Sequence, residues 1–214
     1  MTEISPNYPW RVSITGLILI FLTSCFPTQS SHSPQLEQDL GVNLFYDNTC
    51  KPPCLLGITP GITSDDEAKE IVTVNKEIFK SCEVYEYTDR GGITGILCES
   101  VGIVFDKGIV TEIGYTPKRS LIVGQVIDTY GEPDAVGSII GTIPEVKPRV
   151  KASLYYDEMY MQILLPEQDG NLYHLDPDTH IESIGFLMKE DYEELRKIIP
   201  MSWQGYGTYK GELP

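Results

Sequence analysis

The sequence predicts an α+β fold in which helices pack on one face of an antiparallel sheet. Helix-like segments with capping residues begin near Ser64 and Ser120. Each is followed by short segments rich in Val, Ile and Tyr that turn signals separate. A helix followed by antiparallel strands is an α+β order, and here it occurs twice. The order also indicates a tandem helix-plus-hairpin repeat, over about 50–118 and 119–200.

The first half opens with a helix expected over residues 64–76. Ser64 can act as its N-cap, with Glu67 returning the bond in a capping box, and the acidic first turn suits the positive end of the helix dipole. Strand-like segments follow at 82–88, 93–105 and 109–115. The Asp-Arg-Gly-Gly run between the first two predicts a hairpin turn.

The second half repeats this order. Ser120 is expected to cap a helix that Gly131 ends, and Pro133 prevents its continuation. The remaining expected elements are a hairpin formed by 154–156 and 160–164, a strand over 180–188 and a closing helix over 191–199.

The first 24 residues have the parts of a bacterial export signal. A polar leader ends at Arg11, an apolar run follows, and Leu22-Thr23-Ser24-Cys25 resembles a lipobox. The run is shorter than the roughly 20 apolar residues of a membrane-spanning helix. The resemblance implies that residues 1–24 are removed and that Cys25 carries at least two lipid chains, palmitate among them, enough for stable anchoring. A plain cleaved signal peptide is the alternative.

This interpretation sets the domain organisation and the location. Residues 25–40 are expected to form a flexible tether rich in Ser and Pro, and residues 41–214 a single α+β domain. The expected location is the extracytoplasmic face of the cell membrane or cell envelope. The membrane is then a partner through the lipid on Cys25.

The charge balance excludes some partners. The chain has 31 acidic and 16 basic residues, for a net charge of −15. Such a surface repels phosphate backbones and anionic lipid headgroups, so nucleic-acid binding and a peripheral electrostatic grip on the membrane are not expected. The acidic exterior is most simply a solubility feature, with cation binding as the alternative.

The cysteines also fit an exported protein. Beyond Cys25 the chain has four: Cys50, Cys54, Cys82 and Cys98. An even number favours disulfides outside the cytoplasm. Cys82 and Cys98 flank the predicted hairpin symmetrically, which favours their pairing and leaves Cys50 with Cys54. Closing a loop of about 15 residues contributes about 3 kcal/mol. A zinc site is the alternative, although Cys-x3-Cys is not a tight zinc knuckle.

No catalytic or cofactor motif is present. Metal-ligating residue types gather in one loop at His174, Asp176, Asp178, His180 and Glu182. A metal site is one interpretation, but Asp-Pro-Asp-Thr is typical of a turn, so no metal is predicted. The chain has three histidines and no Gly-x-Ser-x-Gly motif for serine hydrolysis. We therefore predict no catalytic residue and no cofactor.

The thirteen tyrosines indicate a binding surface. Four of them gather around one expected hairpin: Tyr155, Tyr156, Tyr160 and Tyr173. Tyrosine is favoured at interfaces because it buries a large area while its hydroxyl stays hydrated. Tyrosine is also an ordinary strand residue, which is the alternative. The hypothesis is a tyrosine-lined partner surface.

Three segments carry a resemblance. Pro-Cys-Leu-Leu-Gly-Ile-Thr-Pro-Gly at 53–61, Tyr-Gly-Glu-Pro-Asp at 130–134 and the Trp-Gln-Gly-Tyr-Gly-Thr-Tyr run at 203–209 resemble a family of uncharacterised bacterial lipoproteins. The layout is also similar to the SmpA/OmlA-type lipoprotein domain and to the tandem β-lactamase-inhibitor fold. SmpA/OmlA-type proteins are non-enzymatic partners in envelope assembly, so the resemblance implies a similar role. No functional residue carries over.

Together these features predict a lipid-anchored exported protein that is not an enzyme. It is expected to be a binding or envelope-associated module with a protein or envelope partner. One alternative is an extracytoplasmic carboxylate-dependent hydrolase, since the 31 acidic residues allow two-carboxylate chemistry, although none is singled out. The other alternative is an inhibitor of a secreted hydrolase.

Overall fold

The structure, a computed structural model, describes residues 50–76, 79–87, 93–117, 120–141, 147–198 and 201–212. The chain divides into two compact units, Met1–Pro34 and Gln35–Pro214, and every described residue belongs to the second. The helices are α2 (Asp65–Val74), α3 (Val123–Tyr130), α4 (Lys189–Lys197) and the 3₁₀ turn η3 (Asp157–Met159). The strands are β1 (Glu83–Tyr87), β2 (Ile93–Leu97), β3 (Val101–Asp106), β4 (Ile109–Tyr115), β5 (Ala135–Gly141), β6 (Arg149–Tyr156), β7 (Met161–Leu164), β8 (Gln168–Asp169), β9 (Leu172–Leu175), β10 (Ser183–Leu187) and β11 (Gly207–Lys210).

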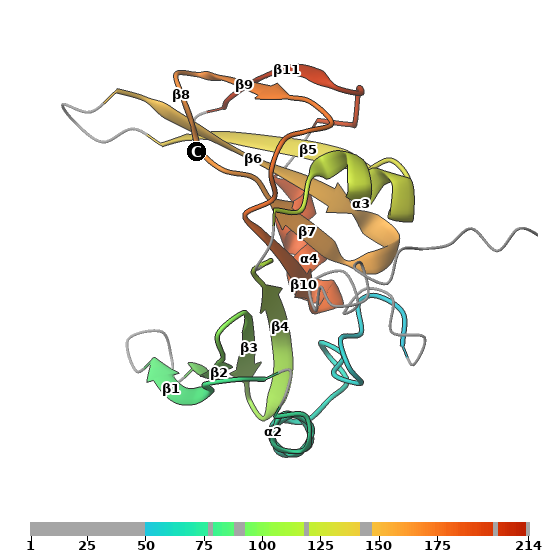
Figure 1. The fold of residues 1–214 in the computed structure, drawn as a ribbon, viewed down its shortest axis with the longest axis vertical. Coiled ribbons are helices and arrows are strands. Elements are labelled where there is room, and N and C mark those ends of the chain that lie inside the picture. Colours follow the sequence, from blue (N-terminus) through green and yellow to red (C-terminus); the bar gives the residue numbers. More distant parts are fainter. Residues whose placement is uncertain are drawn as a thin grey trace, which may run out of the picture. The chain divides into compact units, whose positions relative to one another are not determined.

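The central feature is a nine-stranded sheet in the order β1-β2-β3-β4-β10-β7-β6-β5, with β8 added beside β6 (Figure 1). Every strand pair in it is antiparallel. The predicted α+β class is therefore confirmed. The expected strand over 93–105 is two strands, because residues 98–100 turn the chain between β2 and β3.

The two halves of the sheet join at one strand pair. Strand β4 ends the first run of strands, β10 ends the second, and they pair antiparallel with Gly114 opposite Gly185 and Ile113 opposite Phe186. Near the start of β4, a bulge between Val104 and Phe105 leaves Thr111 as an extra residue, whose hydroxyl donates to the Val104 carbonyl at 3.4 Å.

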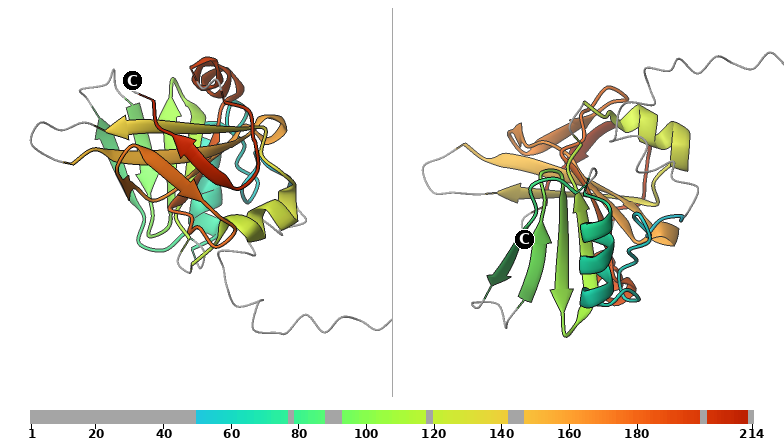
Figure 2. Two further views of the ribbon diagram at one scale, coloured as in Figure 1. Left: turned by 90° about the horizontal axis from the view of Figure 1, so that it is seen from above. Right: turned by 60° about the horizontal axis from the view of Figure 1, so that its bottom comes forward.

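The first predicted helix is confirmed, and the predicted Ser64 cap explains where it begins. The Ser64 side chain accepts from the Glu67 N–H at 3.3 Å, and α2 begins at Asp65. Lys69 pairs with Asp65 one turn earlier, at 2.9 Å. Buried Ala68 and Val72 face the sheet, and α2 lies along β4 in Figure 2.

The cap of the second helix differs from the prediction. The helix begins at Val123, and Ser120 instead hydrogen-bonds to the ring of His180. The N–H groups of Val123 and Gly124 donate to the carbonyls of Thr179 and Pro177, at 2.9 and 2.8 Å. A loop far along the chain thus satisfies the first turn of α3, which local sequence cannot reveal.

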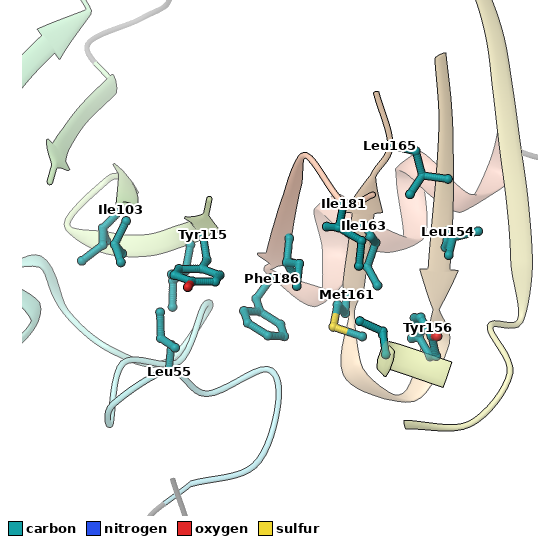
Figure 3. Close-up of a cluster of buried hydrophobic side chains, with 14 of the residues drawn as sticks. Leu55, Ile103, Tyr115, Leu154, Tyr156, Met161, Ile163, Leu165, Ile181 and Phe186 are labelled. Atoms are coloured by element: carbon teal, nitrogen blue, oxygen red, sulfur yellow. The ribbon is translucent and has the colours of Figure 1, made fainter. Parts of the chain in front are cut away.

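Most of the buried side chains form one hydrophobic cluster. It collects residues from both halves of the sheet together with Val72 of α2 and Val126 of α3. Figure 3 shows Leu55 and Tyr115 on one side, with Phe186 and Met161 continuing toward Tyr156. The core therefore runs continuously across the β4–β10 pair.

Helix α4 belongs to a separate cluster. Its Tyr192 is 2% exposed and packs with Tyr155 and Ala135. Tyr155 lies between Leu154 and Tyr156 of the main cluster, so alternation along β6 points it to the opposite face. The expectation that the helices share one face is therefore not confirmed, because α4 uses the other one.

The C-terminal segment covers one edge of the sheet. Strand β11 pairs with β9, Ser202 bridges to Ala135, and Glu212 bridges to Ile139 of β5. The Ser138 hydroxyl, 3% exposed, donates to the Lys210 carbonyl at 2.8 Å. The edge formed by β5 is thus hydrogen-bonded by the chain itself.

Candidate functional site

The two predicted disulfides are present. Cys82 is bonded to Cys98 across the ends of the β1–β2 hairpin, and Cys50 is bonded to Cys54. A zinc site would need the same four sulfurs as thiolates. Because all four are in disulfide bonds, none is free to bind zinc. The described residues contain no group of three or more His, Cys, Asp or Glu side chains that could hold a metal ion.

The predicted lipidation residue, Cys25, lies outside the described residues, as do the signal peptide at 1–24 and the tether at 25–40. Among the helices that the structure describes, none has the length and apolar character needed to cross a membrane.

Three of the four tyrosines expected at a partner surface are core residues, which corrects that expectation. Tyr155 and Tyr156 are 2% exposed and Tyr173 is 1% exposed, so a partner cannot reach them. Burial raises the pKa of Tyr173 to about 12. Tyr160 is only partly buried, and its ring meets Tyr192 edge-on at 5.7 Å. The sequence predicted strands at Tyr155, Tyr156 and Tyr160 but not the strand β9 that holds Tyr173, and it could not show which of the four side chains are covered.

The loop with His174 and His180 is a turn, as its sequence indicated. Asp176 accepts from the Asp178 N–H at 2.9 Å, and the Thr179 hydroxyl accepts from the Asp176 N–H at 3.0 Å. His174 pairs with Thr208 at 2.9 Å. Glu182 binds Lys151 at 2.9 Å. Each of these polar groups therefore has a structural partner.

A different surface is the best candidate for a site. Gly102, Gly114 and Gly185 lie directly opposite one another on the adjacent strands β3, β4 and β10. We call these three the glycine row. Their strand neighbours Ile103, Ile113 and Phe186 point into the core, so the glycine row faces the other way.

Side chains leave this part of the sheet bare. Among the described residues, and apart from chain neighbours, a Cβ atom on Gly114 would meet no atom within 4 Å, and one on Gly102 would touch only Leu97, at 3.8 Å. Leu97, opposite Gly102, is 58% exposed. We call the surface formed by Leu97, Val104 and the glycine row the open face. It exposes backbone and apolar groups together.

Tyr85 borders the open face on β1. Its ring lies over Gly95, where a Cβ atom would come within 2.3 Å of the Tyr85 ring and 2.7 Å of the Ile103 carbonyl oxygen. Gly95 is buried beneath the ring. A tyrosine therefore does lie flat on the sheet, but it is none of the four that the sequence singled out.

Helix α4 covers another part of the same sheet face, over β5 and β6. The Tyr192 hydroxyl donates to Asp157 at 2.8 Å, and the Arg196 guanidinium donates to the same carboxylate at 2.7 Å. The Arg196 bond holds the pKa of Asp157 below its ordinary value. Arg196 also lies 5.7 Å from the centre of the Tyr155 ring. These contacts attach α4 to the end of β6.

A negative group stands between α4 and the open face. Glu112 is opposite both Val104 and Leu187. Partial desolvation, and then the nearby carboxylate of Asp191, raise the pKa of Glu112, although much of the side chain remains exposed. The border of the open face is thus acidic.

No protein-family model, no curated protein and no solved structure matches this chain. The candidate site therefore rests on the geometry alone. One sequence signal could have located it: Ile-Gly-Tyr at 113–115 and Ile-Gly-Phe at 184–186 each place a glycine between two core residues. A glycine inside a strand marks a close approach or an open surface.

Proposed function

We propose that this protein is a non-enzymatic, lipid-anchored binding module of the bacterial cell envelope, and that the open face contacts its partner. The observation that carries the proposal is the glycine row, where no side chain in the described part of the chain comes within 4 Å of a Cβ atom placed on Gly114. A partner can approach the backbone closely there while covering Leu97. A surface of exposed backbone and apolar side chains spread over several strands suits a protein partner, whereas a small molecule prefers a concave pocket.

The anchoring part of the proposal rests on the lipobox resemblance. Residues 1–24 would be the signal peptide, residues 25–40 the tether, and Cys25 the attachment point on the extracytoplasmic face. The disulfides support an oxidising compartment. Metabolic labelling with a palmitate analogue is expected to mark the wild-type protein and to fail with Cys25→Ala. Equal labelling of the wild-type protein and of Cys25→Ala would reject the proposal that Cys25 carries a lipid anchor.

The binding test uses the position where a new side chain fits without disturbing the fold. Gly114→Arg places a long cationic side chain on the open face, where Gly114 has open space and no positive φ. Cross-linking in intact cells, followed by purification, is expected to recover a partner with wild type and at least about tenfold less with the variant. Val74→Arg is the control, because Val74 is 75% exposed on α2. Equal recovery of the partner with wild type, Gly114→Arg and Val74→Arg would reject the open face as the binding surface.

Inhibition of a secreted hydrolase is one form of this binding function. It requires a concave exposed sheet face, and the exposure of Leu97 beside the glycine row supports the exposed part of that requirement. Binding of the purified protein to a panel of secreted hydrolases tests it, with Gly114→Arg as the control. The hydrolase alternative has one candidate carboxylate at the open face, Glu112, and loss of any measured hydrolysis in Glu112→Gln would favour it.

We also propose that the two halves are a tandem repeat with helices on a shared face. In each half a helix precedes antiparallel strands, and the terminal strands β4 and β10 pair at the centre. Both α2 and α3 contribute to the main cluster, whereas α4 would be an addition after the repeat. The matching Ile-Gly-aromatic segments support this alignment, which equates β3–β4 with β7–β10. In an experimental structure, the halves should superpose with this strand equivalence, and failure to superpose would reject it.

A further inference from the structure

The two disulfides differ in accessibility. Cys98 is 6% exposed in the main cluster and its partner Cys82 is partly exposed, whereas Cys50 and Cys54 are both partly exposed at the start of the described chain. The exposed cation of Lys51 lies inside the small loop that they close. An external thiolate can therefore reach both sulfurs of the Cys50–Cys54 disulfide, whereas in the other disulfide it can reach only Cys82, and attack there would have to expel the buried Cys98 sulfur.

The segment after Cys54 has hydrogen bonds and packing of its own, in addition to the disulfide. Leu55 and Ile58 exchange two backbone hydrogen bonds of 2.9 Å, and both side chains are buried, at 1% and 0% exposure. Between them Leu56 and Gly57 have positive φ values of 53° and 90°, as a type I′ turn requires. Figure 3 shows Leu55 beside Tyr115 in the core. Opening the disulfide would thus leave this turn anchored.

This turn points a donor at one of the two sulfurs. The Gly57 N–H donates to Cys50 Sγ at 3.4 Å, and no such bond to Cys54 Sγ occurs among the described residues. A hydrogen bond to sulfur stabilises the negative charge that develops when that sulfur leaves as a thiolate. The two sulfurs are therefore unequal leaving groups.

We propose that the Cys50–Cys54 disulfide is a thiol-exchange site, attacked at Cys54. The thiolate of a peptide or small molecule attacks Cys54 Sγ, and a new disulfide forms between the two. The Cys50–Cys54 bond breaks, and its electron pair leaves with Cys50 Sγ, where the Gly57 N–H stabilises it. The Cys50 thiolate then takes a proton from water, or attacks Cys54 Sγ again and expels the incoming thiolate. This activity is independent of the open face.

The direct test uses the full-length oxidised protein. It is exposed briefly to free cysteine or to an unstructured peptide with one cysteine, trapped with iodoacetamide, and mapped by mass spectrometry. We expect the adduct on Cys54 and the alkyl group on Cys50, in about tenfold excess over the reverse arrangement. Reaction with both thiols would show that the site accepts peptide thiols as well as small ones, and reaction with free cysteine alone would limit it to small thiols.

The other disulfide is the internal control, and Cys82–Cys98 should stay closed over the same period. Equal adducts on Cys50 and Cys54, no reaction with either thiol, or opening of Cys82–Cys98 at the same rate would overturn the proposal.

A matched pair of variants gives a second readout. Cys54→Ser leaves Cys50 beside the Gly57 N–H, and Cys50→Ser leaves Cys54 without that donor. At pH 7, iodoacetamide should alkylate Cys50 at least about threefold faster than Cys54. Equal rates would show that the Gly57 N–H does not distinguish the two sulfurs.

Discussion

The same face of the sheet is treated differently in its two halves. Over β5 and β6, helix α4 packs Tyr192 against Tyr155, and both side chains are buried. From Leu97 of β2 to Gly185 of β10, the described residues include no comparable cover, and Leu97 and the glycine row remain accessible. The covered half has large aromatic side chains on this face, and the uncovered half has glycines.

This difference shows why one half is a candidate site and the other is not. Burying a large aromatic side chain stabilises the fold, and α4 buries Tyr155 on a strand that precedes it in the chain. Glycines without such cover bury nothing, so selection for stability alone does not explain a row of them across three strands. The predictions below test each side of this comparison.

The largest expected effect is on the covered half. Tyr192→Ala removes a buried side chain and is expected to lower the free energy of unfolding by about 3–5 kcal/mol. Denaturant unfolding measures it. Tyr192→Phe keeps the packing and loses only the bond to Asp157, so about 1–2 kcal/mol is expected. Similar losses from both substitutions would mean that packing of α4 contributes little.

The second prediction contrasts two glycines in neighbouring parts of the uncovered half. Gly95→Val would force the new side chain against Tyr85 and the Ile103 carbonyl, at an expected loss of about 1–3 kcal/mol. Gly114→Val meets open space, so a change within about 0.5 kcal/mol is expected. Thermal or denaturant unfolding of both variants measures the contrast. Strong destabilisation by Gly114→Val would show that the open face is covered.

The third prediction concerns the attachment of α4 and its pH dependence. The pKa of Asp157 is lowered by Arg196, so its contribution is present above the ordinary carboxyl value of 3.8 and is lost as pH falls through the lowered native value. The pair is partly solvent-screened, so Asp157→Asn should lose about 1 kcal/mol near pH 6. The unfolding free energies of wild type and variant should converge as the pH falls through the lowered native pKa of Asp157. A constant difference at every pH would contradict the electrostatic origin.

The smallest expected effect lies at the border between the two halves. The pKa of Glu112 is raised, so native stability should fall slightly as pH rises from the ordinary carboxyl value to the raised one. Glu112→Gln removes this slope and should stabilise the protein at pH 7 by less than about 0.5 kcal/mol, since the side chain is largely exposed. A loss of stability in Glu112→Gln would show that the carboxylate has a favourable partner.

Prediction from sequence succeeded where the signal was local. Ser64 and Glu67 are three residues apart, and their hydrogen bond starts α2. Cys82 and Cys98 are symmetric about a turn, and they are bonded. The cap of α3 was mispredicted because Pro177 and Thr179, far along the chain, supply its acceptors. The open face was missed because its glycines come from three separate segments.

The amino-acid sequence by itself determined the α+β class, the start of α2 and the pairing of the cysteines. Caps, turns and hairpins depend on groups a few residues apart, so they can be recognised from residues that are close together in the sequence. Only the tertiary structure decided which tyrosines are buried and which glycines lie side by side. Tyr155 is covered by Tyr192 of α4, and Gly114 meets Gly185 across the sheet. Such neighbours are joined by long-range packing and strand register, which no local pattern encodes.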